Sequence, residues 1–420
     1  MRFLKYFSLL IVILFLLLVN VKRLPNHYAI NIFDFIDVIF PVGFSSHLKL
    51  IAYNERNSRT ILNDYNEKFL PETQFNTMDF KKIRLDFVEE SNVKYINILK
   101  RKPFYIEFFG DYLIVTPKNG KFYYQNIEDI QRKVNFKEIL SNLKTDYVLD
   151  TFIKNQVLYV SYVKIKEGCR FLNLVRAKIN LENLNFKNIF SSKECAAVVQ
   201  GGRIQQYDKN NNTYILFSAY GILDENLSLN EEEPFAQDDN SIYGKIIAVD
   251  ESDNSFKIFS KGHRNILGLY VDGEYILSTE NGPRGGDEIN RIYENKNYGW
   301  DIASYGKKYQ SDEAYKDHKS LGFEEPIFSF IPSIGISEIV KIDNDFDDDW
   351  KNNYIIGSLN YKHLLRVKFD NNFKKLEYYE KIFVGERMRD LKYFNKKSMI
   401  LIALEDTGSI GILIDKKSSN

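Results

Sequence analysis

From residue 105 onward the chain is a series of short apolar or alternating runs separated by polar turns. Two runs at 105–109 and 112–115 are followed by the turn 117–120, which reads Pro-Lys-Asn-Gly, and by a third run at 121–124. Strand side chains alternate between two faces, and Pro, Asn and Gly favour tight turns, so the pattern predicts consecutive antiparallel strands. Further runs of this kind lie at 147–152, 157–163, 213–218, 245–249, 268–271, 275–278, 354–358, 364–369 and 399–404.

Long segments with helical periodicity are scarce, and strands do not alternate with helices as they do in parallel α/β proteins. The chain contains 28 Tyr and 32 Phe, residue types that suit strands. All-β propellers can exceed the usual domain size as one unit, and their blades share shape with little sequence identity. We therefore predict a single all-β domain over residues 24–420, although the pattern between 24 and 100 is weak.

The N-terminus differs from the rest of the chain. Arg2 and Lys5 precede an apolar run at 7–19, and two more basic residues follow at 22–23. This pattern is typical of a secretory signal, and the run is shorter than the about 20 residues of a membrane span. The absence of a small-x-small cleavage site favours an uncleaved anchor over a cleaved signal. We predict that residues 1–23 direct the protein to the periplasm and contact the membrane.

Charge and cysteine content limit the classes of partner. The formal net charge is +0 and the isoelectric point is about 7.0, so the sequence gives no electrostatic reason to expect nucleic acid as a partner. Two cysteines, Cys169 and Cys195, lack the spacing of a metal site. Export would allow a disulfide between them. Two buried free thiols are an alternative that the sequence supports equally well.

The residue types best suited to ligand binding are concentrated in the segment 262–300. Arg264 offers a planar fork of donors that matches a carboxylate. The Gly-Pro pair at 282–283 predicts a tight turn whose carbonyl groups converge. Asp287 and Glu288 carry the hard oxygen ligands that Ca²⁺ prefers. The segment therefore predicts an anion site beside a metal site.

These motifs resemble the pyrroloquinoline quinone (PQQ)-dependent aldose dehydrogenases, the glucose/sorbosone dehydrogenase family. The resemblance is strongest over residues 195–415 and implies a six-bladed β-propeller whose first blades come from the N-terminal third. The matching motifs are 201–203 (Gly-Gly-Arg), 262–265 (Gly-His-Arg-Asn), 280–290, 297–300 (Asn-Tyr-Gly-Trp), 387–390 (Arg-Met-Arg-Asp) and 405–408 (Glu-Asp-Thr-Gly).

In that family a quinone with three carboxylates lies across the mouth of the propeller. The resemblance implies that Arg264, Arg387 and Arg389 pair with these carboxylates through charge-assisted hydrogen bonds. It also implies that Asn265 bonds the cofactor and that Asp406 lies nearby. Arg387 and Arg389 are two residues apart, and on a strand this spacing puts both on one face.

The resemblance also implies two Ca²⁺ sites. The main-chain carbonyl groups of Gly282 and Pro283 would hold the ion that polarises the quinone. Glu288 and the main chain of Tyr298 would form a second, structural site.

The chain departs from the family at the catalytic base, a histidine that precedes the Gly-Gly-Arg motif. Here that position is occupied by Val198, Val199 or Gln200, none of which titrates near neutral pH. None of the five histidines lies between residues 48 and 262, so a shift in alignment does not restore the base. His263 is expected to be a packed residue rather than a ligand.

Two further positions differ. The Gly-Asp pair that supports the histidine in the family is replaced by Ala-Tyr-Gly at 219–221. A lysine of the fifth blade aligns with Asn360, while Lys362 lies two residues later. Asp224 or Glu225, on the next loop, offers an alternative base.

Two functions follow as hypotheses. The first is a PQQ-dependent dehydrogenase that oxidises a sugar hydroxyl to the lactone. The second is a catalytically silent propeller that binds a carbohydrate or a partner protein, and the missing histidine favours it. A metal-dependent lactonase ranks last, because it would need acidic and amide residues on several blades beyond the 280–290 turn.

Overall fold

The computed structural model describes residues 78–90, 101–130, 136–196, 198–221, 235–308, 313–343, 346 and 348–415. The proposed signal or anchor at 1–23 and the alternative bases Asp224 and Glu225 lie outside these residues. Within the described ranges, no helix combines the length and the apolar character needed to cross a membrane. The helices found there are single 3₁₀ turns at Lys319–Leu321, Asp348–Trp350 and Asn395–Lys397.

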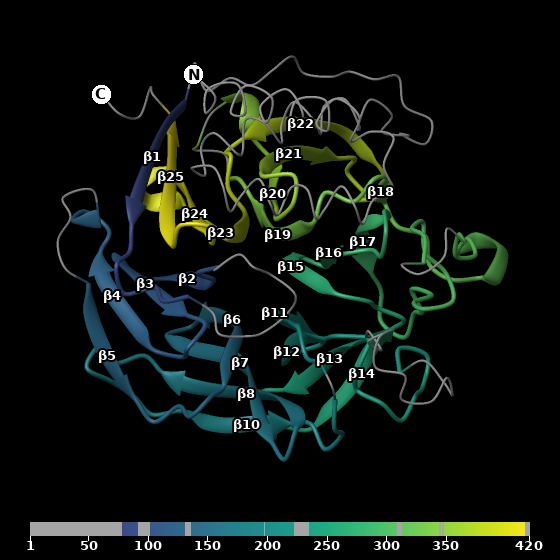
Figure 1. The fold of residues 1–420 in the computed structure, drawn as a ribbon, viewed down its shortest axis with the longest axis horizontal. Helices are drawn as coiled ribbons and strands as arrows, with labels where there is room; N and C mark the ends of the chain where they lie inside the picture. Colours follow the sequence, from purple (N-terminus) through teal and green to yellow (C-terminus); the bar gives the residue numbers. More distant parts are fainter. Residues whose placement is uncertain are drawn as a thin grey trace, which may run out of the picture.

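The strands form sheets that are arranged around a central axis as the blades of a propeller (Figure 1). Blade 1 consists of β2 (Phe104–Phe109), β3 (Tyr112–Pro117), β4 (Phe122–Asn126), β5 (Lys137–Ser141) and the short β9 (Asn183–Leu184). Blade 2 consists of β6 (Tyr147–Lys154), β7 (Val157–Lys166), β8 (Cys169–Lys178) and β10 (Lys187–Ser191). Blade 3 consists of β11 (Gly201–Lys209), β12 (Asn212–Ala219), β13 (Lys245–Asp250) and β14 (Phe256–Lys261).

The remaining blades follow the same plan. Blade 4 consists of β15 (Ile266–Asp272), β16 (Tyr275–Glu280), β17 (Asp287–Ile292) and β18 (Phe328–Phe330). Blade 5 consists of β19 (Ile336–Lys341), β20 (Tyr354–Ser358), β21 (His363–Phe369) and β22 (Leu376–Phe383). Blade 6 consists of β23 (Met388–Phe394), β24 (Met399–Leu404), β25 (Ser409–Asp415) and β1 (Met78–Arg84). The prediction of an all-β, six-bladed propeller is confirmed.

The ring is closed by strands from the two ends of the described chain. Strand β1 pairs antiparallel with β25, from Met78 opposite Asp415 to Arg84 opposite Ser409. Blade 6 therefore combines three C-terminal strands with one N-terminal strand, and its closure depends on hydrogen bonds and packing rather than on a covalent link.

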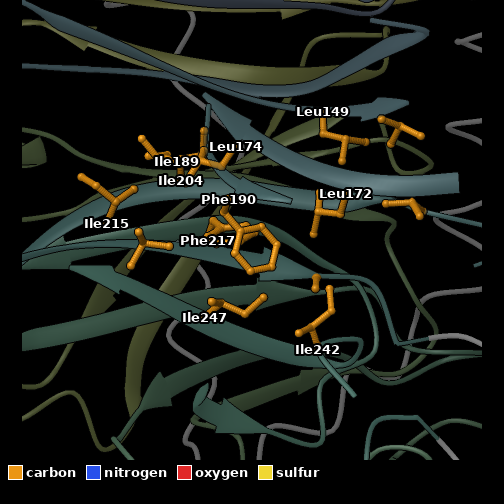
Figure 2. Close-up of a cluster of buried hydrophobic side chains, with 14 of the residues drawn as sticks. Leu149, Leu172, Leu174, Ile189, Phe190, Ile204, Ile215, Phe217, Ile242 and Ile247 are labelled. Atoms are coloured by element: carbon orange, nitrogen blue, oxygen red, sulfur yellow. The ribbon is translucent and has the colours of Figure 1, made fainter. Parts of the chain in front are cut away.

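Apolar side chains pack between neighbouring blades and hold them together. Figure 2 shows the cluster between blades 2 and 3, where Leu149 and Leu174 from blade 2 lie with Ile204 and Phe217 from blade 3. Phe217 is completely buried. Full burial of a Leu or Phe side chain contributes about 1.5–3 kcal/mol, so each interface of this kind is a large part of the stability.

The Gly-Gly-Arg motif has a packing role at the same interface. Gly202 has φ +82°, and a Cβ added there would lie 2.5 Å from Cβ of Leu149 and 2.8 Å from Oγ of Ser161. Only glycine adopts this backbone conformation at low cost and leaves room for the neighbouring blade. The motif thus fixes how closely β11 approaches β6 and β7.

The two cysteines are joined by a disulfide, with 5.0 Å between the Cα atoms of Cys169 and Cys195. The bond links the start of β8 to the segment that leads into β11. Of the two alternatives that the sequence leaves open, the structure thus has the disulfide.

Candidate functional site

The candidate site lies at one face of the ring because of the strand order. Neighbouring inner strands contact each other in the sequence β2, β6, β11, β15, β19, β23 and back to β2. In a four-stranded antiparallel blade, the start of the inner strand and the turn between the second and third strands lie at the same end. We call this face, made of the residues that enter the inner strands and of those turns, the mouth.

One carboxylate at the mouth holds two arginines. Nε of Arg387 lies 2.5 Å from Oε1 of Glu405, and Nε of Arg389 lies 2.7 Å from Oε2 of the same side chain. Burial opposes the ionisation of Glu405, but the charges of Arg389 and Arg101 hold its pKa below the usual value. Both arginines therefore lie on one face of the chain at the start of β23, as their spacing predicts.

The outer nitrogens of these arginines differ in their contacts. Nη1 of Arg387 donates to Oδ1 of Asn360 at 2.8 Å. The Nη groups of Arg389 have no hydrogen-bond partner in the described part of the chain. Because a guanidinium offers five donors in a planar fork, Arg389 retains donors that can bind a planar anion.

The carboxylate of Asp406 forms an ion pair with a lysine at the mouth. Its Oδ2 lies 2.8 Å from Nζ of Lys362 and accepts a hydrogen bond from the main-chain N–H of Arg387 at 3.2 Å. Lys362 is 5% exposed. The lysine of blade 5 at the mouth is therefore Lys362, and Asn360, the other candidate, is a partner of Arg387.

Arg264 is fixed at the entrance to β15 by two motif segments. Its Nη1 donates to the carbonyl oxygen of Asn281 at 2.8 Å, and its guanidinium lies 5.2 Å from the ring centroid of Trp300. The main-chain N–H of Arg264 donates to the carboxylate of Glu280. Residues that are distant in sequence thus converge on one buried cation.

Asn265 adjoins the predicted position of the base. Its Nδ2 lies 3.5 Å from Oε1 of Gln200, and its buried Oδ1 has no hydrogen-bond partner among the described residues. A buried amide oxygen without a partner is costly, so this atom is suited to a ligand that donates a hydrogen bond.

The three candidate residues at the base position have different surroundings. Val199 belongs to the apolar cluster between blades 2 and 3, and its carbonyl oxygen accepts a hydrogen bond from the hydroxyl of Tyr147 at 3.0 Å. Val198 is buried, and Gln200 contacts Asn265. None of the three side chains can remove a proton from a sugar hydroxyl.

His263, expected to be a packed residue, is fully enclosed. Its Nε2 lies 2.8 Å from Oγ of Ser260, its Nδ1 lies 3.2 Å from Oε2 of Glu280, and its ring stacks on Tyr298. It is therefore committed to the core and does not reach the mouth.

The predicted Ca²⁺ turn is dense in main-chain oxygen atoms. A Cβ at Gly282 would collide with the carbonyl oxygens of Gly285 and Gly286. The sequence suggests Asp287 as a Ca²⁺ ligand, but both of its carboxylate oxygens accept hydrogen bonds from the main chain, so it is not available to a metal. Its Oδ1 accepts from the N–H of Gly282 at 3.0 Å, and its Oδ2 accepts at 2.9 Å from two main-chain N–H groups at 334 and 336.

The second predicted metal site contains an excess of buried acid. Burial and the charge of Glu280 raise the pKa of Glu288 well above its usual value. Nε2 of His318 lies 3.7 Å from Oε1 of Glu288, and burial lowers the pKa of His318. The negative charges of Glu325, Glu280 and Asp317 oppose that lowering of the pKa.

A further ionic cluster, not predicted from the sequence, lies in the channel. Nη1 of Arg203 is 2.8 Å from Oδ1 of Asp150, 2.6 Å from Oε2 of Glu338 and 3.2 Å from Oδ1 of Asp390. These carboxylates are close enough together to bind a metal ion, but the guanidinium of Arg203 lies between them. Three carboxylates on separate strands give no local signal in the sequence.

A cavity of about 580 Å³ opens at the other end of the channel, away from the mouth. Its lining includes Glu107, Gln205, Tyr270, Glu338 and Lys392. Nζ of Lys392 pairs with Oε1 of Glu107 at 2.7 Å. The cavity therefore shares Glu338 with the channel cluster but none of the residues predicted to bind the cofactor.

Sequence comparison identifies the family. The family described as Glucose / Sorbosone dehydrogenase matches residues 100–412. Aldose sugar dehydrogenase YliI of Escherichia coli is 28% identical over 216 residues, which are 47% of this chain and 57% of the relative. A protein of Synechocystis sp. described as uncharacterized is 31% identical over 173 residues, 37% of this chain and 42% of the relative. The chain thus matches about half of the length of these curated relatives.

Solved structures show the same fold. A glucose dehydrogenase has a TM-score of 0.66 at 21% identity, over 80% of this chain and 99% of its own. The apo-form of the soluble aldose sugar dehydrogenase from Escherichia coli has a TM-score of 0.65 at 20% identity, over 80% and 99%. The PQQ-bound aldose sugar dehydrogenase from Streptomyces coelicolor has a TM-score of 0.55 at 16% identity, over 80% and 98%. With its motifs placed at the mouth of a six-bladed propeller, this chain belongs to the glucose/sorbosone dehydrogenase family.

Proposed function

We propose that this protein is a PQQ-dependent sugar dehydrogenase that oxidises an aldose hydroxyl to the lactone. The observation that carries the proposal is the pair Arg387 and Arg389, which Glu405 holds side by side at the mouth. The unused donors of Arg389 suit a carboxylate of the cofactor, because paired guanidinium–carboxylate bonds are strong and directional.

The other mouth residues extend this anion site. Arg264 adds a buried positive charge, Lys362 contributes an ammonium paired with Asp406, and the unpartnered amide oxygen of Asn265 can accept a hydrogen bond from the cofactor. Together with the arginine pair, these residues would hold a flat, multiply charged molecule over the channel. When bound there, PQQ would supply the hydride acceptor that no side chain can provide.

Calcium is part of the proposal. The carbonyl groups of Gly282 and Pro283 would hold an ion next to the cofactor, and hard main-chain oxygens are suitable ligands for Ca²⁺. Glu288 with the main chain of Tyr298 would form the second site. Its support is the raised pKa of Glu288, since a carboxylate buried close to Glu280 would be stabilised by a bound cation.

We place the protein on the periplasmic side of the membrane, held there by residues 1–23 or released after their cleavage. The disulfide between Cys169 and Cys195 supports export, because such bonds persist in oxidising compartments. The partner would be a small sugar, and neutral net charge gives no support to nucleic-acid binding.

Calorimetric titration of PQQ into the full chain, with Ca²⁺ present, tests the proposal. We expect saturable binding that is lost in Arg389→Met and retained in Arg84→Met, whose side chain is 69% exposed in the structure. Circular dichroism of both variants controls for folding. If the parent protein binds no PQQ, or if Arg389→Met binds it equally well, the cofactor assignment is wrong.

The second candidate function is a binding propeller without catalysis. It is favoured by the residues at the place of the family's histidine, because none of Val198, Val199 and Gln200 offers a base. Turnover of an aldose with an artificial electron acceptor distinguishes the two: PQQ binding without any turnover supports the silent propeller.

A further inference from the structure

Lys118 lies in the turn between β3 and β4, which faces the mouth. The same turn in other blades carries Asn281, Lys362 and Glu405, all of which belong to the candidate site. The carbonyl oxygen of Lys118 accepts a hydrogen bond from the N–H of Val148 at 2.8 Å. The turn of blade 1 is thereby fixed to the first residues of β6 in blade 2.

The side chain of Tyr147 contacts both Lys118 and the segment 198–200, where the family's histidine would lie. Nζ of Lys118 lies 4.9 Å from the ring centroid of Tyr147. The hydroxyl of Tyr147 donates to the carbonyl oxygen of Val199 at 3.0 Å. Through the buried side chain of Tyr147, Lys118 is therefore connected to the segment that enters blade 3.

The surroundings of Lys118 lower the pKa of its ammonium, although the ring of Tyr147 attracts a cation. Burial and the positive charge of Arg389 lower its pKa to about 8, and the carboxylate of Glu405 opposes this only in part. Within the described residues, the ammonium has no hydrogen-bond acceptor. Lys362, by contrast, is paired with Asp406 at 2.8 Å, so its charge is neutralised within the protein.

We propose that Lys118 is the general base of the sugar oxidation, acting from the turn of blade 1 in place of the histidine that precedes the Gly-Gly-Arg motif in the family. The inference rests on the proposed function, since it needs a bound quinone and an aldose. Lysine is a known general base where its surroundings disfavour the ammonium form.

In the proposed oxidation, the sugar gives a hydride to the quinone and a proton to Lys118. The C–H bond of the oxidised sugar carbon breaks, and its hydride carries two electrons to the quinone, which is reduced. The hydroxyl proton moves to the Nζ lone pair of Lys118, and the electron pair of the O–H bond forms the new C=O bond. The resulting ammonium returns its proton to solvent before the next cycle.

The experiment compares three variants of the full chain. Lys118→Arg keeps the positive charge but cannot act as a base near neutral pH, because arginine stays protonated. Lys118→Ala opens space for a small amine. Lys121→Met, which alters an exposed lysine of the same turn, is the matched control. Each is tested by PQQ calorimetry, by the pH dependence of kcat and by rescue with ethylamine.

We expect all variants to bind PQQ. For Lys118→Arg we expect kcat to fall by about 10²–10⁴-fold, with loss of the rise in rate that we expect of the parent as pH passes through about 8. Ethylamine should raise the activity of Lys118→Ala and leave Lys118→Arg unchanged. Lys121→Met should match the parent.

A readout without turnover completes the test. The ε-carbon resonance of Lys118, assigned by its loss in Lys118→Arg, should titrate near 8 in the protein without cofactor rather than at the about 10.4 of a free lysine. Titration near 10.4, or full activity of Lys118→Arg, overturns the role of Lys118 and leaves the dehydrogenase function standing. Absence of PQQ binding or of turnover in the parent overturns both.

Discussion

Nη1 of Arg203 lies 2.6 Å from Oε2 of Glu338, so that a cation from blade 3 meets a carboxylate from blade 5 inside the channel. The same guanidinium reaches blade 6, where Nη2 donates to the carbonyl oxygen of Arg389 at 2.7 Å. The ionic cluster of the channel is thus directly connected to the arginine pair of the mouth.

Removal of Arg203 should destabilise the whole ring. Arg203→Met leaves Asp150, Glu338 and Asp390 buried without their shared cation, and breaking a buried pair costs about 3–5 kcal/mol. Urea denaturation followed by circular dichroism measures the loss. Arg84→Met is the exposed control and should change the free energy of unfolding by less than about 0.5 kcal/mol. An equal effect of the two substitutions would contradict this account of the channel.

The channel should also make stability depend on pH. Burial raises the pKa of Glu107 to about 8, although Lys392 opposes the shift. The folded protein therefore holds a proton on Glu107 that the unfolded chain loses above about 4.5, and the stability from this group falls as pH rises from about 4.5 to 8. Glu107→Gln mimics the protonated form, so its free energy of unfolding relative to the parent should increase across this window. A constant difference between pH 5 and 8 would exclude the shift.

Two glycines with the same φ should respond differently to alanine. Gly202 and Gly168 both have φ +82°, but a Cβ at Gly168 meets nothing within 4 Å, whereas a Cβ at Gly202 meets Leu149 at 2.5 Å. Gly168→Ala should lower the free energy of unfolding by about 1–2 kcal/mol, the cost of placing alanine in the left-handed conformation. Gly202→Ala should cost about 1–3 kcal/mol more, because it overpacks the interface of blades 2 and 3. Thermal and urea unfolding of both variants provides the comparison.

The disulfide should stabilise the segment that enters blade 3. Cys169 and Cys195 are 26 residues apart, and closing a loop of this length stabilises the folded state by about 3–4 kcal/mol, because it lowers the entropy of the unfolded chain. The double substitution of both cysteines by serine should lower the free energy of unfolding by this amount. A loss below about 1 kcal/mol would mean that the loop stays ordered in the unfolded chain without the bond.

Much of the fold was predictable because the information is local. The runs that become β3 and β24 are apolar and almost completely buried, and such strands are recognisable from their composition alone. Strand β14, by contrast, begins with exposed Phe256 and Lys257, and the two-residue β9 lacks any period. Outer strands of this kind depend on pairing with their neighbours, which a single sequence does not display.

The candidate site was predictable where a motif acts through its own spacing. Arg387 and Arg389 lie on one face because strands alternate, and both are held as a pair. The sequence suggests Asp287 as a Ca²⁺ ligand, and this prediction is wrong. Its partners are main-chain N–H groups at 334 and 336, which come from a distant loop that the local sequence does not reveal. The choice between Asn360 and Lys362 likewise depended on the approach of blade 6.

The pairing of β1 with β25 has a consequence for how this molecule is made. Residues 409–415 pair with 78–84, so the last blade cannot form until residue 415 has been synthesised. Until β1 and β25 pair, each of the two strands exposes an unpaired edge once it is made, and such edges associate readily with other chains. Production of this protein should therefore be sensitive to truncation at either end of the ring, even where the mouth is left intact.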